Sequence, residues 1–74
     1  MTPQQALGII NREPVGGAHY YSTARDRFYK NYGDEWLSYY NDEWNLHTSI
    51  LRSTRMTLIP MWKLLEIVTD FKVL

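Results

Sequence analysis

The longest hydrophobic pattern in the chain has the spacing of an α-helix. Five ring-bearing or aliphatic side chains recur at intervals of three or four residues: Trp36, Tyr40, Trp44, His47 and Leu51. Side chains at such intervals share one face of a helix. Asp34 stands just before this stripe and is a suitable N-cap. We therefore expect one long amphipathic helix over residues 34–53.

The first residues carry the signature of a helix start. Thr2 can cap the helix, Pro3 fits its first position, and Gln5 completes a capping box. This motif predicts a short helix over residues 2–11.

A glycine-rich stretch separates this helix from the next element. Residues 12–21 contain Pro14 and the pair Gly16-Gly17, which break helices. The glycines lack the spacing of a phosphate-binding loop. We therefore expect a connecting loop here, without a nucleotide site.

Two further segments have amphipathic spacing. In residues 22–32 a helical spacing puts Phe28 and Tyr32 on one face with Tyr21 and Ala24, and Gly33 is a suitable terminator. In residues 58–72 the polar side chains occupy one narrow face, and Pro60 suits a first turn. We expect a helix in each segment. A strand over residues 56–59 is the alternative, although no partner strand is evident.

Together these elements predict an all-α fold. It is a small bundle of three main helices plus a short N-terminal helix, in a single domain over residues 1–74. The chain has no cysteine to reinforce a core of 74 residues, but 15% of its residues are aromatic and can supply buried area. The motif Asp-Glu-Trp occurs at residues 34–36 and again at 42–44. We interpret this repeat as chance similarity within one helix.

The chain carries no recognisable catalytic machinery. It has no cysteine, and no motif places a serine or threonine at a strained turn. Glu43 and His47 stand one helical turn apart, but a single such pair is weak evidence for a metal site. His47 is more simply a core residue. We expect no enzyme activity, no cofactor and no metal.

The location of the protein is indicated only by absences in its sequence. No segment is long and apolar enough to span a membrane, and the first residues do not form a secretory signal. We expect a cytoplasmic protein, located in the host cytoplasm if its source is viral.

Two charged residues interrupt the apolar faces of the expected helices. Arg25 falls within the apolar arc of one helix, and Glu43 lies on the apolar side of the next. An unpaired buried charge is costly, so we expect Arg25 and Glu43 to form a buried pair or each to meet a partner chain. Alternatively, both lie at the edge of the arc and extend into water.

Binding to another protein is the function that the pattern favours. An apolar helix over residues 58–72 offers more surface than three short neighbours can cover, so a second copy or a different protein would cover the rest. This expectation includes homo-oligomerisation. The residues expected to contact the partner are Met61, Trp62, Leu65, Tyr39, Asp34 and Asp42.

A compact chain with many aromatic residues and no catalytic residues is typical of small viral or phage accessory proteins. Such proteins act as host-factor inhibitors or minor structural components. In an inhibitor, the acids Asp34, Glu35 and Asp42 would mimic nucleic-acid phosphates. The simpler interpretation is that they are ordinary acids at a helix start.

Single-stranded nucleic acid is the alternative partner. Basic and aromatic residues alternate in one segment: Tyr20, Tyr21, Arg25, Arg27, Tyr29 and Lys30. Such a mixture can stack on bases and neutralise phosphates. The net charge of zero, and four acids without a base in residues 34–45, argue against this partner.

Overall fold

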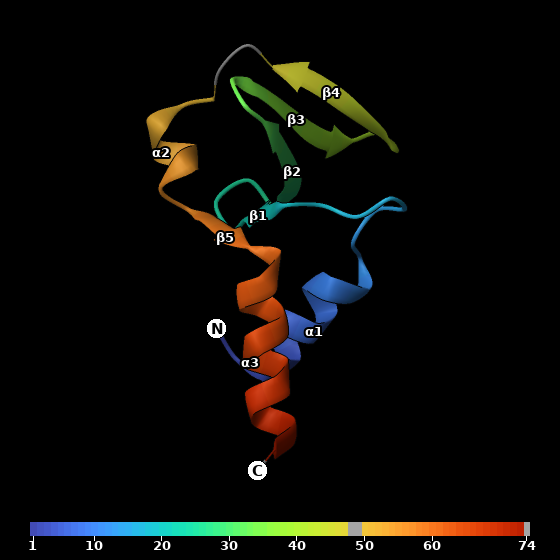
Figure 1. Ribbon diagram of the computed structural model, residues 1–74, viewed down its shortest axis with the longest axis vertical. Helices are drawn as coiled ribbons and strands as arrows, with labels where there is room; N and C mark the ends of the chain where they lie inside the picture. The colour runs from blue at the N-terminus through green and yellow to red at the C-terminus, as the bar shows by residue number, and fades with distance from the viewer. Residues whose placement is uncertain (48–49, 74) are drawn as a thin grey trace.

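A computed structural model describes residues 1–47 and 50–73, with side chains described up to residue 70. In these residues the chain forms a five-stranded antiparallel sheet, two packed helices and one short helical turn (Figure 1). The elements follow one another as α1 (Pro3–Asn11), β1 (Tyr20–Ser22), β2 (Arg27–Tyr32), β3 (Glu35–Tyr40), β4 (Glu43–His47), α2 (Arg52–Arg55), β5 (Leu58–Pro60) and α3 (Met61–Val73).

Strands β1 to β4 form a meander, and β5 joins the sheet beside β1. The strands lie in the order β4-β3-β2-β1-β5. β5 pairs antiparallel with β1, with Tyr21 opposite Ile59 and Tyr20 opposite Pro60. Because α3 begins directly after Pro60, the helices leave the sheet at the β5 side, and β4 forms the opposite edge (Figure 1).

Tight turns with left-handed residues set the register of the meander. Asn41 and Asp42 join β3 to β4 with φ of 54° and 62°, the pattern of a type I′ turn. Gly33, with φ of 65°, and Asp34 join β2 to β3, and only the glycine has a positive φ, as in a type II′ turn. Asp26 ends the longer β1–β2 turn with φ of 53°. Once the register is fixed, each strand residue has a fixed face.

Alternation along the strands gives the sheet two different faces. The apolar face packs against α1 and α3 and carries Tyr21, Phe28, Tyr39, Trp44 and Ile59. The opposite face, named here the arginine face, carries Tyr20, Arg27, Tyr29, Trp36, Ser38, Tyr40 and His47.

The core lies between the apolar face and the two packed helices. Its helical side chains come from both helices: Ala6 and Ile9 from α1, and Met61, Leu64 and Val68 from α3. Against them lie the rings of Tyr21 and Phe28, which meet edge to face with centroids 5.2 Å apart. Leu64 is completely buried. The core therefore forms where α1 and α3 pack against each other and against the rings of Tyr21 and Phe28.

The expected helix over residues 34–53 is wrong. Its residues form β3, β4, the turn between them and the first half of α2, and residues 48–49 of this expected helix lie outside the described residues. The four-residue spacing from Trp36 to Tyr40 fits a helix, but four is also a multiple of the strand period of two. Aromatic residues favour strands, and the two left-handed turn residues prevent a continuous helix.

The Asp-Glu-Trp repeat is explained by the hairpins. In each copy the aspartate ends a two-residue turn, and the glutamate and tryptophan begin the next strand. Strands punctuated by turns every eight or so residues are typical of antiparallel sheets. The interpretation of this repeat as chance similarity within one helix was therefore wrong.

The expected helix over residues 22–32 is also wrong, and the all-α helical bundle with it. This segment forms the end of β1, a turn and β2. Strand pairing places Phe28 opposite Tyr21 and Tyr29 opposite Tyr20. The chain is therefore a five-stranded antiparallel sheet with three helices in its described residues.

The two terminal helices are closer to expectation. α1 has the predicted capping box: the Gln5 amide N–H donates to Thr2 Oγ1, and the Thr2 amide N–H donates to Gln5 Oε1. The C-terminal helix begins at Met61, because Leu58–Pro60 forms β5 instead. The strand alternative lacked a partner in the sequence, and β1 supplies it.

We predict that stability depends on Leu64 and not on its neighbour Leu65. The Leu64→Ala substitution removes a fully buried side chain and should lower the free energy of unfolding by about 2–5 kcal/mol. The Leu65→Ala substitution is a matched control, because Leu65 is 53% exposed, and should change it by less than about 0.5 kcal/mol. Urea denaturation measures both, and equal losses would contradict the assigned helix face.

Candidate functional site

The arginine face carries polar and aromatic side chains next to one another. The Arg27 guanidinium lies over the ring of Tyr40, 4.7 Å from its centroid. The ring centroids of Tyr20 and Trp36 lie 5.9 Å apart. Tyr40 is exposed, and Tyr20 and Trp36 are half-buried. This face therefore offers aromatic surface beside a positive charge.

A small pocket opens between this face and the segment that precedes β5. Its volume is about 180 Å³, and it is lined by Arg25, Arg27, Tyr29, His47, Ile50, Leu51 and Thr54. The strands supply one wall, and α2 with the residues before it supplies the other. The pocket thus brings together residues up to 29 positions apart in the chain, as the Arg25–Thr54 contact shows.

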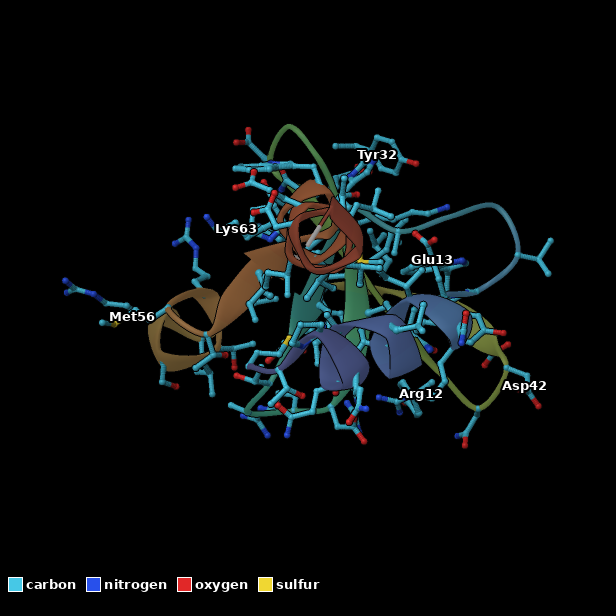
Figure 2. The ribbon with its side chains drawn as sticks, turned by 90° about the horizontal axis from the view of Figure 1, so that it is seen from below. Arg12, Glu13, Tyr32, Asp42, Met56 and Lys63 are labelled. Atoms are coloured by element: carbon cyan, nitrogen blue, oxygen red, sulfur yellow. The ribbon has the colours of Figure 1, made fainter. Side chains whose placement is uncertain are left out.

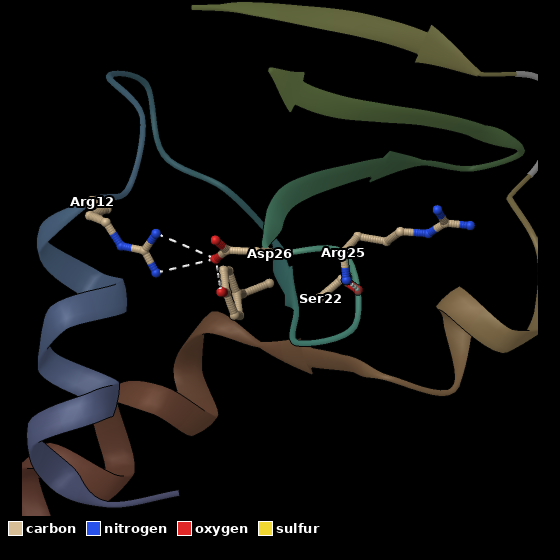
Figure 3. Close-up of polar contacts among 5 residues, drawn as sticks. Arg12, Ser22, Arg25 and Asp26 are labelled. Carbon is tan, nitrogen blue, oxygen red and sulfur yellow. Dashed lines mark hydrogen bonds and ion pairs between the residues drawn. The ribbon is translucent and has the colours of Figure 1, made fainter. Parts of the chain in front are cut away.

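Hydroxyl groups join the end of β1 and the β1–β2 turn to α2 and to Thr57, which follows it. Ser22 Oγ and Thr57 Oγ1 lie 3.0 Å apart and share a hydrogen bond. The amide N–H of Arg25 donates to Ser22 Oγ, and its Nε donates to Thr54 Oγ1 at 3.4 Å. Figure 3 shows the Arg25 side chain extending away from Asp26 on the side of α2. The position of Arg25 is therefore supported from both walls of the pocket.

A second polar contact orients the imidazole at the other end of the pocket. Ser38 Oγ and His47 Nε2 are 2.6 Å apart and share a hydrogen bond. Ser38 is completely buried. The ring of His47 is thereby held against the sheet. His47 had been expected in a helical core, but it lines this pocket instead.

Four arginines of the β1–β2 turn, β2 and α2 have no carboxylate partner in the described part of the chain: Arg25, Arg27, Arg52 and Arg55. The ion pairs found there, Arg12–Asp26 and Lys63–Glu66, involve other basic residues. Glu43 is the one acid that strand pairing places on the arginine face, opposite Tyr40. Figure 2 shows Asp42, in the β3–β4 turn, across the molecule from Met56 at the end of α2. The α2 side of the site is therefore strongly positive.

Four of the six residues predicted to bind nucleic acid lie at this site. Strand alternation places Tyr20, Arg27 and Tyr29 on the arginine face, and Tyr21 and Lys30 on the apolar face. Arg25 also contributes from the turn. Tyr29 is only 4% exposed, so its ring cannot stack on a ligand. The Lys30 ammonium instead lies 4.5 Å from the centroid of Trp44.

The predicted buried pair of Arg25 and Glu43 is wrong. Both residues are exposed, and they form no ion pair with each other. The prediction assumed two facing helices. In the sheet, Arg25 lies in a turn and Glu43 begins the edge strand β4, so neither charge needs a buried partner.

The residues predicted to contact a protein partner are dispersed. Met61 is only 8% exposed and belongs to the core, whereas Trp62 is 62% exposed. Leu65 is exposed one turn further along α3. Tyr39 packs on the core from the apolar face.

The acids Asp34 and Asp42 stand before and after β3. The six-residue strand between them spans roughly 20 Å, so Asp34 and Asp42 do not form one acidic patch. The sequence argument for phosphate mimicry assumed that they did.

A second, larger pocket lies beside α1. Its volume is about 440 Å³, and it is lined by Met1, Gln5, Gly8, Ile9, Arg12, Tyr21 and Thr23. The Arg12 guanidinium contacts Asp26 Oδ1 at 3.4 Å, and the Tyr21 hydroxyl donates to the same carboxylate (Figure 3). The polar groups here satisfy one another. This network links α1 to the β1–β2 turn and thus has a structural role.

The network also shifts the pKa values of its three members, and the hydrogen bond with Tyr21 raises the pKa of Arg12. The hydrogen bond from Tyr21 lowers the pKa of Asp26, and the positive charge of Arg12 lowers it further. Burial raises the pKa of Tyr21, and its hydrogen bond to Asp26 adds to the rise.

The described residues contain neither a candidate metal cluster nor a candidate membrane span. No cluster of three histidine or acidic side chains could hold a metal ion there. None of the helices described in residues 1–47 and 50–73 is long and apolar enough to cross a membrane.

Several residues of the site were missed in the sequence: Trp36, Tyr40, Thr54, Arg52 and Arg55. The two-residue turns were the available signal, because they impose a period of two that places Trp36 and Tyr40 on one face. Nothing local indicates that α2 lies against this face, since its position depends on the pairing of β5 with β1.

We predict that the Asp26 charge stabilises the fold above acidic pH. Because its pKa is lower in the folded chain, its contribution is complete above the ordinary value of 3.8 and is lost as the pH falls through the lower folded value. Asp26→Asn keeps an acceptor and tolerates the left-handed backbone. It should cost about 0.5–1 kcal/mol at neutral pH, since Asp26 is largely exposed.

Urea denaturation of both proteins across the acidic range measures this contribution. The difference between them should shrink as the pH falls below 3.8. A difference that stays constant over the whole range would contradict the assignment.

The geometry of the arginine face is the available guide to function. No protein-family model, curated protein or solved structure matches this chain.

Proposed function

We propose that the protein binds single-stranded nucleic acid on the arginine face. The observation that carries this proposal is a group of four arginines without carboxylate partners. Arg25 and Arg27 line the pocket beside the exposed ring of Tyr40, and Arg52 and Arg55 lie on α2, whose Thr54 also lines it. Guanidinium groups bind phosphate with paired hydrogen bonds, and every base can stack on an aromatic ring. A flexible polymer of phosphates and bases fits both features.

The size of the pocket supports a polymer over a free nucleotide. At about 180 Å³, it is smaller than the roughly 300–1,000 Å³ of ordinary ligand sites. A phosphate group can enter it between Arg25 and Arg27. The bases would then lie outside, where Tyr40 is exposed.

A neutral net charge is compatible with this function because the charges are separated in space. Asp26 is paired with Arg12 on the other side of the β1–β2 turn, and Glu66 is paired with Lys63 on α3. The unpaired arginines remain on one side. Electrostatic attraction to phosphates depends on this local field more than on the total.

We predict binding that is sensitive to salt and to the arginines of α2. Fluorescence anisotropy with a labelled oligothymidylate of about 12 nucleotides suits a site of this kind. Four phosphate contacts should give a slope of about −3 for the logarithm of affinity against that of salt concentration. Arg52→Ser with Arg55→Ser should weaken binding by about tenfold or more at low salt and roughly halve the slope.

Lys63→Ser on α3 is the control for a lost positive charge. Lys63 is exposed and pairs with Glu66 away from the arginine face, so its loss should leave affinity unchanged. Absence of binding at low salt would refute the proposal, as would equal effects of the Lys63 and Arg52/Arg55 variants.

Contact with another protein through α3 remains a second candidate. It rests on Trp62 and Leu65, which are exposed on adjacent turns of α3. Tryptophan is frequent among the residues that dominate binding energy at interfaces. Capture from cells of the source by the wild-type chain, but not by Trp62→Ser with Leu65→Ser, would support it. The same variant should retain oligonucleotide binding.

A further inference from the structure

The edge strand β4 is open to pairing. It is the last strand of the sheet, and nothing in the described residues lies beyond it (Figure 1). Edge strands are usually protected by proline, lysine, a bulge or shortness. β4 pairs regularly with β3 over five residues and contains neither proline nor lysine. Its side chains include Leu46, which is 62% exposed.

The other edge of the sheet is protected. β5 has only three residues and ends in Pro60, which has no amide N–H. α3 then follows without a break. Strand addition is therefore possible at β4 and not at β5.

The β3–β4 turn determines which backbone groups of β4 are free. A two-residue turn is closed by a pair that exchanges both backbone hydrogen bonds, here Tyr40 and Glu43. Counting along the strand, Trp44 and Leu46 then direct their N–H and C=O groups away from β3. The same counting from the β2–β3 turn directs the Asn31 N–H away from β3, and it donates to His19 Nδ1 on the β1 side.

We propose that β4 pairs antiparallel with β4 of a second copy of this chain. With Asn45 on the twofold axis, Trp44 faces the partner's Leu46 and exchanges both backbone hydrogen bonds with it. The twofold axis repeats the same two hydrogen bonds between Leu46 and the partner's Trp44. The sequence of β4 is self-complementary in this register, which is why a second copy is the occupant that fits.

The side chains agree with this register on both faces. On the apolar face, Trp44 lies beside the partner's Leu46, an aromatic–aliphatic pair of the kind that stabilises sheets. On the arginine face, Glu43 lies opposite the partner's His47, and Asn45 lies opposite the partner's Asn45. No like charges face each other, and the exposed Leu46 gains cover.

The dimer would join two binding faces into one. A twofold axis perpendicular to the sheet keeps both arginine faces on the same side of a continuous ten-stranded sheet. The pairing rests on β4 alone and does not depend on nucleic-acid binding. A longer single strand would contact both copies if the proposed function holds.

The solution mass of the protein as a function of concentration tests the pairing. We expect a reversible dimer with a dissociation constant on the order of 100 µM, because one strand pair buries little area. Leu46→Pro removes an outward N–H without affecting a bond to β3, and should leave a monomer. Leu46→Ala is the matched control: it keeps the N–H and should still dimerise, with affinity reduced by less than tenfold.

Three outcomes of this experiment would overturn the proposal. They are a wild-type monomer at about 1 mM, a dimer that survives Leu46→Pro, and a dimer lost only in Trp62→Ser with Leu65→Ser. Oligonucleotide binding by a monomeric Leu46→Pro chain would leave the proposed function intact, so the two proposals fail separately.

Disulfide cross-linking tests the register and does not require the proline variant to fold. The chain contains no cysteine, so Asn45→Cys introduces a single thiol on the proposed twofold axis. Directly opposed residues that do not exchange hydrogen bonds lie close enough for a disulfide. Mild oxidation should cross-link this variant rapidly and Leu46→Cys slowly, and equal or reversed rates would overturn the register.

Discussion

The tight turns of the meander are the constraint on which this structure depends. Two turns contain only two residues, and their positive backbone angles at Gly33, Asn41 and Asp42 fix the pairing of the flanking strands. A slip of one residue would exchange the two faces of the sheet. The turns therefore decide which aromatic side chains form the core and which remain available for contact.

The two faces of the sheet differ in how far they are covered. On the apolar face, Tyr21 and Phe28 are covered by α1 and α3 around the fully buried Leu64. On the arginine face, Tyr29 and Ser38 are buried, whereas Tyr40 is exposed. Buried rings thus supply much of the apolar area that so short a chain needs. On the other side, the exposed ring of Tyr40 lies beneath the Arg27 guanidinium.

The local signals in the sequence predicted local structure correctly. The capping box of Thr2 and Gln5 acts within one helical turn, and it was found as expected. The stripe through Trp36, Tyr40 and Trp44 was misleading, because its spacing fits both a helix and a strand. The Gly-Asp and Asn-Asp pairs between the strands would have separated these possibilities.

Other features depend on contacts that no local pattern contains. β5 forms because β1 offers it a partner some forty residues away, with Tyr21 opposite Ile59. That pairing brings α2 to the arginine face, where Thr54 supports Arg25. For this reason Arg52 and Arg55 could not be recognised as neighbours of the β1–β2 turn, although the basic and aromatic character of residues 19–30 could be seen.

The central claim is that the alternation of side chains along the strands places the binding surface on one side of the sheet, the arginine face. The most direct test is to map backbone amide chemical shifts during titration with a short oligothymidylate. The account predicts changes at Arg25, Arg27, Tyr40 and along α2, with α1 and α3 unaffected. Chemical-shift changes concentrated on α3 around Trp62 and Leu65, with no changes on the arginine face, would contradict it.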